Sequence, residues 1–182
     1  MSEADFVAGA VEVAGLTASA ARAAYADPEL AATIPVAVET GYSVSRRPIG
    51  DTGAGDGARS AANFACEVSF WRANVGPTGD ELMRYTVDKY FESDGTNILN
   101  WDVSEAGTVT YLGQVGGWSF RGTLLSTDGD RAFGSAHYSQ RVGEFQTLNS
   151  FSWTPELQVI VHANGDIELF WPGERDSQLT WC

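Results

Sequence analysis

Most of the chain beyond residue 33 consists of short segments in which apolar and polar residues alternate, and this alternation restricts the fold more than any other feature. A period of two is typical of β-strands that bury one face, as in NFACEVSFWRA, where Phe64, Cys66, Val68 and Phe70 fall on one side. Turn-forming residues separate such segments at 92–97, 126–131 and 163–166. Because no long helical stretch lies between them, the sequence predicts a mainly β fold, a compact antiparallel β-sandwich.

The chain length of 182 residues is typical of a single domain with one full-sized hydrophobic core. Residues 46–60 read RRPIGDTGAGDGARS and are expected to form a flexible loop between two strands, because Gly and Asp dominate them.

Residues 4–26 have a different pattern and predict an amphipathic helix in front of the strands. On a helical wheel one broad face holds Phe6, Val7, Ala10, Val11, Val13 and Ala14, and the other holds Asp5, Glu12 and Ser19. Gly9 and Gly15 each weaken the helix by up to about 1 kcal/mol relative to Ala. Asp27 is placed to cap a short following helical turn, with Pro28 at its first position.

The opening segment lacks the features of a secretory signal, because Glu3, Asp5 and Glu12 stand where a signal has basic or apolar residues. No signal peptide is visible, so export is expected to use a signal absent from this sequence or another route. No apolar run reaches the roughly 18 residues of a conventional transmembrane helix.

The chain is strongly acidic, with 24 Asp and Glu against 11 Lys and Arg, a net charge of -13. Lys89 is the only lysine. Such a surface repels nucleic acid and anionic lipid, so we expect no nucleic-acid partner and, if a membrane is bound, a zwitterionic one.

The sequence holds no recognisable catalytic or metal-binding constellation. His137 and His162 lie on different predicted strands without an evident partner, and neither pairs with Cys66 through any local motif. We therefore expect no enzyme activity, no cofactor and no metal. Cys66 is predicted to be buried, while Cys182 either forms a bridge to it or is a free thiol.

Core packing is expected to account for most of the six tryptophans, and at least one of them is predicted to serve a surface. The candidates for a membrane or ligand surface are Trp118, Trp153 and Trp171.

The segment ADFVAGAVEVAGLTAS, residues 4–19, resembles the N-terminal segment of the actinoporins, a family of pore-forming toxins. The matching residues are Val7, Ala8, Gly9, Ala10, Val11, Leu16 and Thr17, with Phe6 inserted after Ala4 and Asp5. The resemblance implies an amphipathic helix that leads into a compact β-sandwich of about this length. The chain departs from the family in its acidic charge and in lacking the family's aromatic phosphocholine-site motif.

Residues 154–182 resemble the C-terminal part of the thermostable direct haemolysin family, which shares the actinoporin-like sandwich. The matching residues are Thr154, Pro155, Glu156, Val159, Val161, Gly165 and Ile167, followed by a Cys near the end. That family pairs this Cys with one on the preceding strand. The equivalent region here has none, so Cys182 is left to pair with Cys66 or to stay free.

The two resemblances imply a secreted, soluble, pore-forming cytolysin that binds a membrane as a monomer and inserts its helix in an oligomer. Phe6, Val7, Ala10, Val11, Val13 and Ala14 would then enter the membrane, and Asp5, Glu12 and Ser19 would line the pore. The alternative is a non-lytic β-sandwich that binds a glycan or a protein, with the helix packed permanently on a sheet. The two hypotheses differ in what covers the apolar face of the helix.

Overall fold

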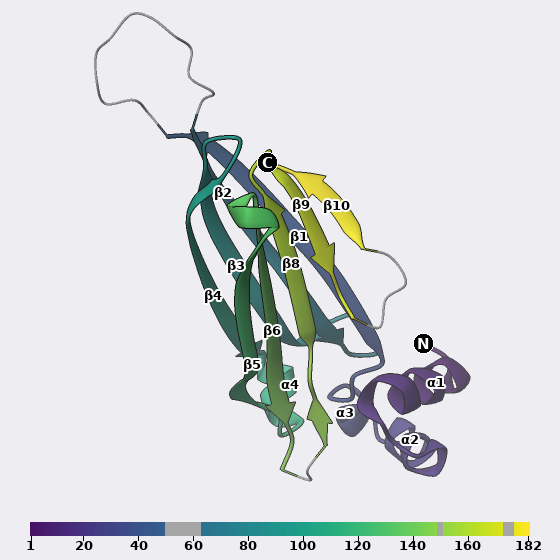
Figure 1. Ribbon diagram of the computed structural model, residues 1–182. Coiled ribbons are helices and arrows are strands. Elements are labelled where there is room, and N and C mark those ends of the chain that lie inside the picture. The colour runs from purple at the N-terminus through teal and green to yellow at the C-terminus, as the bar shows by residue number, and fades with distance from the viewer. Residues whose placement is uncertain (50–62, 149–150, 173–176) are drawn as a thin grey trace, which may run out of the picture.

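Two antiparallel β-sheets pack against each other, and three short helices precede the first strand (Figure 1). The computed structural model describes residues 1–49, 63–148, 151–172 and 177–182. The helices are α1 (Glu3–Ala14), α2 (Ala18–Tyr25) and α3 (Pro28–Ala31). The prediction of a mainly β, antiparallel sandwich preceded by a helix is confirmed.

The first sheet holds four long strands in the order in which they follow along the chain. They are β1 (Ala37–Pro48), β2 (Phe64–Val75), β3 (Glu81–Ser93) and β4 (Ile98–Val109). Each strand therefore pairs with the one before it, which is the simplest arrangement for strands joined by short connections.

The second sheet has the order β10-β9-β8-β6-β5, with β7 also paired to β6. Its strands are β5 (Ser119–Arg131), β6 (Ala136–Gln146), β7 (Ser152–Trp153), β8 (Glu156–His162), β9 (Asp166–Phe170) and β10 (Gln178–Trp181). A short helix, α4 (Tyr111–Val115), connects the two sheets, and a 3-10 turn at Ala132–Gly134 joins β5 to β6.

The core lies between the inner faces of the two sheets, as the alternation predicts. Phe64, Cys66, Val68 and Phe70 are all buried on the inner face of β2. They belong to one apolar cluster with residues of the opposite sheet, Leu157, Val159, Val161, Ile167 and Leu169. Full burial of each such side chain stabilises the fold by about 1.5–3 kcal/mol, so this cluster is the main source of stability.

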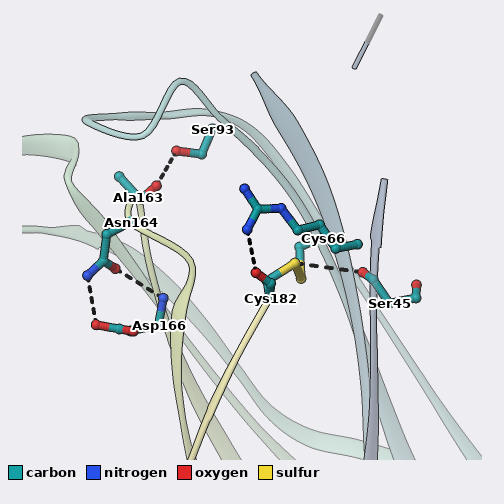
Figure 2. Close-up of a disulfide and its surroundings, with 8 residues drawn as sticks. Ser45, Cys66, Ser93, Ala163, Asn164, Asp166 and Cys182 are labelled. Carbon is teal, nitrogen blue, oxygen red and sulfur yellow. Dashed lines mark hydrogen bonds between the residues drawn. A yellow bond between two sulfur atoms is a disulfide. The ribbon is translucent and has the colours of Figure 1, made fainter. Parts of the chain in front are cut away.

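A disulfide between Cys66 of β2 and Cys182 joins the two sheets, which decides between the two states left open for Cys182 (Figure 2). It lies at the end of the sandwich farthest from the helices (Figure 1). The backbone around Cys182 is also held by hydrogen bonds, because its N–H donates to Gly165 O at 2.9 Å and its carbonyl accepts from Arg46 Nη1 at 2.7 Å.

Two local expectations need correction. Residues 126–131 were expected to turn, but they belong to β5, and the chain reverses after them, at Ala132–Gly134. The reason is that Asp128 pairs with Arg141 across the strands and therefore keeps this segment in the sheet. The expected loop 46–60 begins later, because Arg46, Arg47 and Pro48 still belong to β1, and residues 50–60 lie outside the described residues.

Removing the disulfide is expected to lower the free energy of unfolding by about 5 kcal/mol, because it closes a loop of 116 residues in the unfolded chain. The variant is Cys66→Ala with Cys182→Ala, measured by urea unfolding of the purified protein. The reduced wild-type protein is the control and should share the lowered midpoint. A double variant as stable as the oxidised wild type would contradict the bridge.

Candidate functional site

The N-terminal arm, defined as residues 1–31 with α1, α2 and α3, is built from three helices that each begin at a capping side chain. Ser2 caps α1, Thr17 caps α2 and Asp27 caps α3, each accepting hydrogen bonds from backbone N–H groups of the first turn. Pro28 is the first residue of α3, so the predicted cap and proline position are confirmed.

Gly15 divides the expected helix 4–26 into two. It adopts a left-handed backbone with φ of 69°, a conformation that glycine reaches without steric cost. Leu16 N–H then donates back to Ala10 O at 3.2 Å, which ends α1, and α2 starts anew at Ala18. The apolar pattern continues through this point, and so the periodicity alone predicted one helix.

The arm has an apolar cluster of its own, separate from that of the sandwich. Its buried members are Phe6, Ala10, Ala21, Ala24, Ala31 and Val36. The Phe6 ring packs on Tyr25 with 5.3 Å between ring centroids. Because most members are alanines, the helices approach closely, and only Val36 belongs to the segment that leads into β1.

The residues expected to enter a membrane are in different environments in this conformation. Phe6 and Ala10 are fully buried in the arm cluster, Val7, Val13 and Ala14 are partly buried, and Val11 is 41% exposed. The three residues expected to line a pore, Asp5, Glu12 and Ser19, are all exposed.

Trp118 and Trp171 belong to the sandwich core and are nearly covered, so neither presents its ring on an open surface in this structure. They are 6% and 5% exposed, and Trp171 Nε1 donates to Trp71 O at 3.1 Å. Trp153 is partly buried against Phe145, with 5.1 Å between ring centroids. Sequence alternation indicates that a residue shares a face with others but does not say which face is covered.

One group of exposed apolar side chains lies at the end of the sandwich that carries the arm. This apolar end comprises Leu30 of α3, Tyr111 and Val115 of α4, and Leu148 and Phe151 between β6 and β7. Tyr111 is 78% exposed and Leu148 is 93% exposed. Figure 1 shows α3, α4 and the β6–β7 connection at the same end of the molecule. The sequence contains a sign of this surface that was not used: these apolar residues lie outside the alternating segments, where no strand places them in the core.

The only lysine of the chain lies inside the sandwich. Lys89 of β3 is 1% exposed; its Nζ donates to Ser139 Oγ at 2.7 Å and contacts His137 Nδ1, both on β6. The Trp101 ring covers the pair, with 4.0 Å between its centroid and that of His137. Burial lowers the pKa of Lys89 to about 7, and burial together with the charge of Lys89 lowers the pKa of His137 to about 4.

Arg141 forms a second buried polar group beside this pair. It donates to both oxygens of Asp128, at 3.1 and 2.8 Å, and its Nε donates to Glu105 at 3.1 Å. Burial opposes the charge of Asp128, but the hydrogen bonds from Arg141 and Ser139 and the charges of Arg141 and Lys89 together outweigh it and lower the pKa of that carboxyl. The planar guanidinium thus joins β4, β5 and β6 on the polar side of the core.

The buried polar groups around Lys89 and Arg141 form hydrogen bonds and ion pairs with one another, as groups that stabilise a fold do. Each charged group has a partner within the sandwich, and Trp101 separates Lys89 and His137 from solvent. His162, the second histidine, pairs with Glu168 at 2.7 Å. In the described part of the chain, no three His, Cys, Asp or Glu side chains are placed to hold a metal ion.

A shallow groove of about 370 Å³ runs over the outward face of the four-stranded sheet. Ser43, Ser69, Asp88, Tyr90 and Asp102 line it. Hydroxyl and carboxylate groups beside one aromatic ring are suited to hydrogen bonding with a polar ligand.

Scans against protein-family models, curated proteins and solved structures found no match to this chain. Of the helices in the ranges that the structure describes, none is long and apolar enough to cross a bilayer by itself.

The arm is expected to detach from the sandwich more readily when Gly9 is replaced by Ala. A Cβ added to Gly9 would overlap the carbonyl oxygen of Val36, so α1 would have to move away from the start of β1. Trypsin cleavage at Arg22, the only Lys or Arg before residue 46, measures the opening, because Arg22 is exposed but lies within α2, which has to lose its packing and unwind before the protease can cut. Gly9→Ala should be cleaved several-fold faster, while Val11→Ala, which changes an exposed side chain, should be cleaved at the wild-type rate. Equal rates for both variants would show that this contact does not hold the arm.

Lys89 is expected to make the fold more stable as pH rises from 7 towards 10.5. In this window the unfolded chain keeps a proton on the lysine, whose usual pKa is 10.5, and the folded protein has released it. The free energy of unfolding should rise by up to about 1.4 kcal/mol per pH unit, measured by urea unfolding at pH 7.5, 8.5 and 9.5. The Lys89→Met variant should lose this slope, since the chain has no other lysine, and Ser139→Ala should keep it. A slope that persists in Lys89→Met would assign it to another group.

Proposed function

We propose that this protein is a pore-forming protein that docks on a neutral-lipid membrane by its apolar end and inserts its N-terminal arm as part of an oligomer. The observation that carries this proposal is that the arm has its own apolar cluster, separate from the core of the sandwich. Moving the arm therefore leaves the two sheets packed together, because no residue of the arm belongs to their core.

The insertion step requires α1 and α2 to join. The 12 residues of α1 extend over about 18 Å, which is shorter than the hydrocarbon core of about 30 Å. A continuous helix over residues 3–25 would be about 35 Å long and would reach across. For this the backbone has to become helical at Gly15, which is left-handed, and at Thr17, which is extended with ψ of 151°.

A joined helix would separate its polar and apolar residues in the way a pore requires. Asp5, Glu12 and Ser19 follow each other at intervals of seven residues, so they would stay close to one line along the helix. This acidic line would face water in an oligomer, while Phe6, Val7, Ala10, Val11, Val13 and Ala14 would face lipid or neighbouring helices.

The apolar end is suited to the first contact with lipid. Tyr111 provides a ring of the kind that is enriched at membrane interfaces, and Val115, Leu148 and Phe151 add apolar surface around it. The net charge of -13 disfavours anionic lipid, so the partner proposed is a zwitterionic bilayer.

Export to an oxidising compartment is part of the same proposal. The Cys66–Cys182 disulfide supports it, because such bonds persist mainly outside the cytosol. The order of a helix followed by a sandwich is also the one that the resemblance to actinoporins implies, and the resemblance to the haemolysin family implies the same sandwich.

The proposal predicts that Thr17→Pro abolishes dye release from phosphatidylcholine vesicles. Thr17 has φ of -71°, which proline shares, so the bent arm still forms, but proline prevents a continuous helix through residue 17. Thr17→Ala is the matched control, since it also loses the helix cap, at a cost of about 1 kcal/mol, yet allows the helices to join. We expect the wild type and Thr17→Ala to release dye and Thr17→Pro to release at least about tenfold less.

Two results would contradict the proposal in different ways. Equal release by Thr17→Pro and Thr17→Ala would show that the helices do not need to join. No release by any of the three proteins at micromolar concentration would refute pore formation altogether.

The second result would favour the alternative, a non-lytic module that binds a glycan. The groove over the outward face of the four-stranded sheet supports this alternative, because serine hydroxyls, Asp88, Asp102 and Tyr90 line it. In that case the complete burial of Phe6 and Ala10 would mean that the arm is a permanent part of the fold.

A further inference from the structure

A cavity of about 290 Å³ lies between the arm and the apolar end of the sandwich. Its walls come from both sides: Leu16, Ala20 and Leu30 belong to the arm, and Trp118 and Phe151 belong to the sandwich. Ile34, in the connection between α3 and β1, also lines the cavity. The contact between the two parts is therefore incompletely filled.

The lining excludes a charged ligand. None of the twelve residues around the cavity is charged, although charged residues make up 19% of the chain. The two threonines are already engaged, since Thr33 Oγ1 donates to Leu30 O at 2.8 Å and Thr147 Oγ1 accepts from Phe151 N–H at 3.2 Å. A ligand inside would thus meet mainly apolar side chains, which favours a hydrocarbon.

The size of the cavity sets the size of that hydrocarbon. An engineered apolar cavity of about 150 Å³ in another protein stays dry and binds benzene, a six-carbon ring. A cavity nearly twice that volume has room for a chain of roughly ten carbons. The exposed side chains of Leu30 and Phe151 belong both to the lining and to the apolar end, so the cavity is continuous with that surface.

We propose that this cavity binds the hydrocarbon chain of a neutral single-chain amphiphile and that the bound chain holds the arm on the sandwich. Because both parts form the walls, the complete cavity exists only while the arm is docked. A ligand that binds only the docked state stabilises it by a factor of 1 + [L]/Kd. The amphiphile would therefore oppose arm release, a regulatory role that rests on the proposed pore-forming function, whereas the binding itself does not.

The test uses 1-decanol as the probe, with trypsin cleavage at Arg22 as the measure of arm opening in the absence of membrane. Binding is first titrated through the fluorescence change of Trp118 and its neighbours. At a decanol concentration ten times the dissociation constant, cleavage should slow about tenfold, because it follows the population of the open state. 1-Hexanol, which fills less of the cavity, should protect less at the same concentration.

Ala20→Leu and Ala23→Leu form a matched pair on α2. Both residues are exposed, but only Ala20 lines the cavity, so a leucine there would occupy the space of the ligand. We expect Ala23→Leu to be protected by decanol as the wild type is, and Ala20→Leu to lose at least about tenfold in decanol affinity.

Three results would overturn the inference: no protection of the wild type, equal protection of both leucine variants, or faster cleavage in decanol. None of these measurements involves a bilayer, so they separate this inference from the proposed function. Protection by decanol without any dye release would support ligand binding in the cavity and refute pore formation. Dye release without protection by decanol would refute ligand binding in the cavity and support pore formation.

Discussion

The structure depends on the packing of two sheets whose inner faces close over one core without help from the N-terminal arm. β2 and β3 contribute Phe70, Val87 and Phe91, and β8 and β9 contribute Val159 and Ile167, all fully buried. The disulfide links the sheets at one end, and Trp118 covers the core at the other. Because no residue of the arm belongs to this core, the fold of the sandwich does not depend on close packing of the arm against it. The contact between the arm and the sandwich can therefore contain a cavity.

One side of that core contains buried charged side chains, which are unfavourable to bury and which restrict the register of the strands. Burying Lys89 disfavours its charge, and removing one member of the Arg141 group would leave an unpaired charge inside. Such groups fix the register of the strands that carry them, because a slip by one residue would turn Lys89 and Arg141 outward. Asp128 illustrates the effect, since its pairing with Arg141 keeps residues 126–131 in β5.

The strands could be predicted from the sequence because alternation is a local property, whereas the site depends on contacts between distant residues. Phe64 to Phe70 alternate and are buried, as expected. The helix 4–26 could not be predicted to break, because its apolar pattern continues past Gly15 and the bend is stabilised by the packing of α1 on α2, in which Phe6 contacts Tyr25. The burial of Trp118 and Trp171 could not be predicted from the sequence either, because alternation does not show which face of a strand is covered. Lys89 did leave a signal, since it stands in the inward series of Tyr85, Val87 and Phe91.

In the proposed pore-forming function, the bend at Gly15 makes the arm a two-state element whose balance depends on its surroundings. The bent arm covers the ring of Phe6, and exposing that ring to water in a straight helix costs about 2–3 kcal/mol, which lowers the population of the straight form about 30- to 150-fold. The bent form is therefore expected to dominate in water. A bilayer or a neighbouring copy would remove this cost, because Phe6 and Val11 would then meet lipid or protein in place of water. The same apolar residues would thus favour the compact arm in solution and the straight arm at a membrane, with no change in sequence or charge.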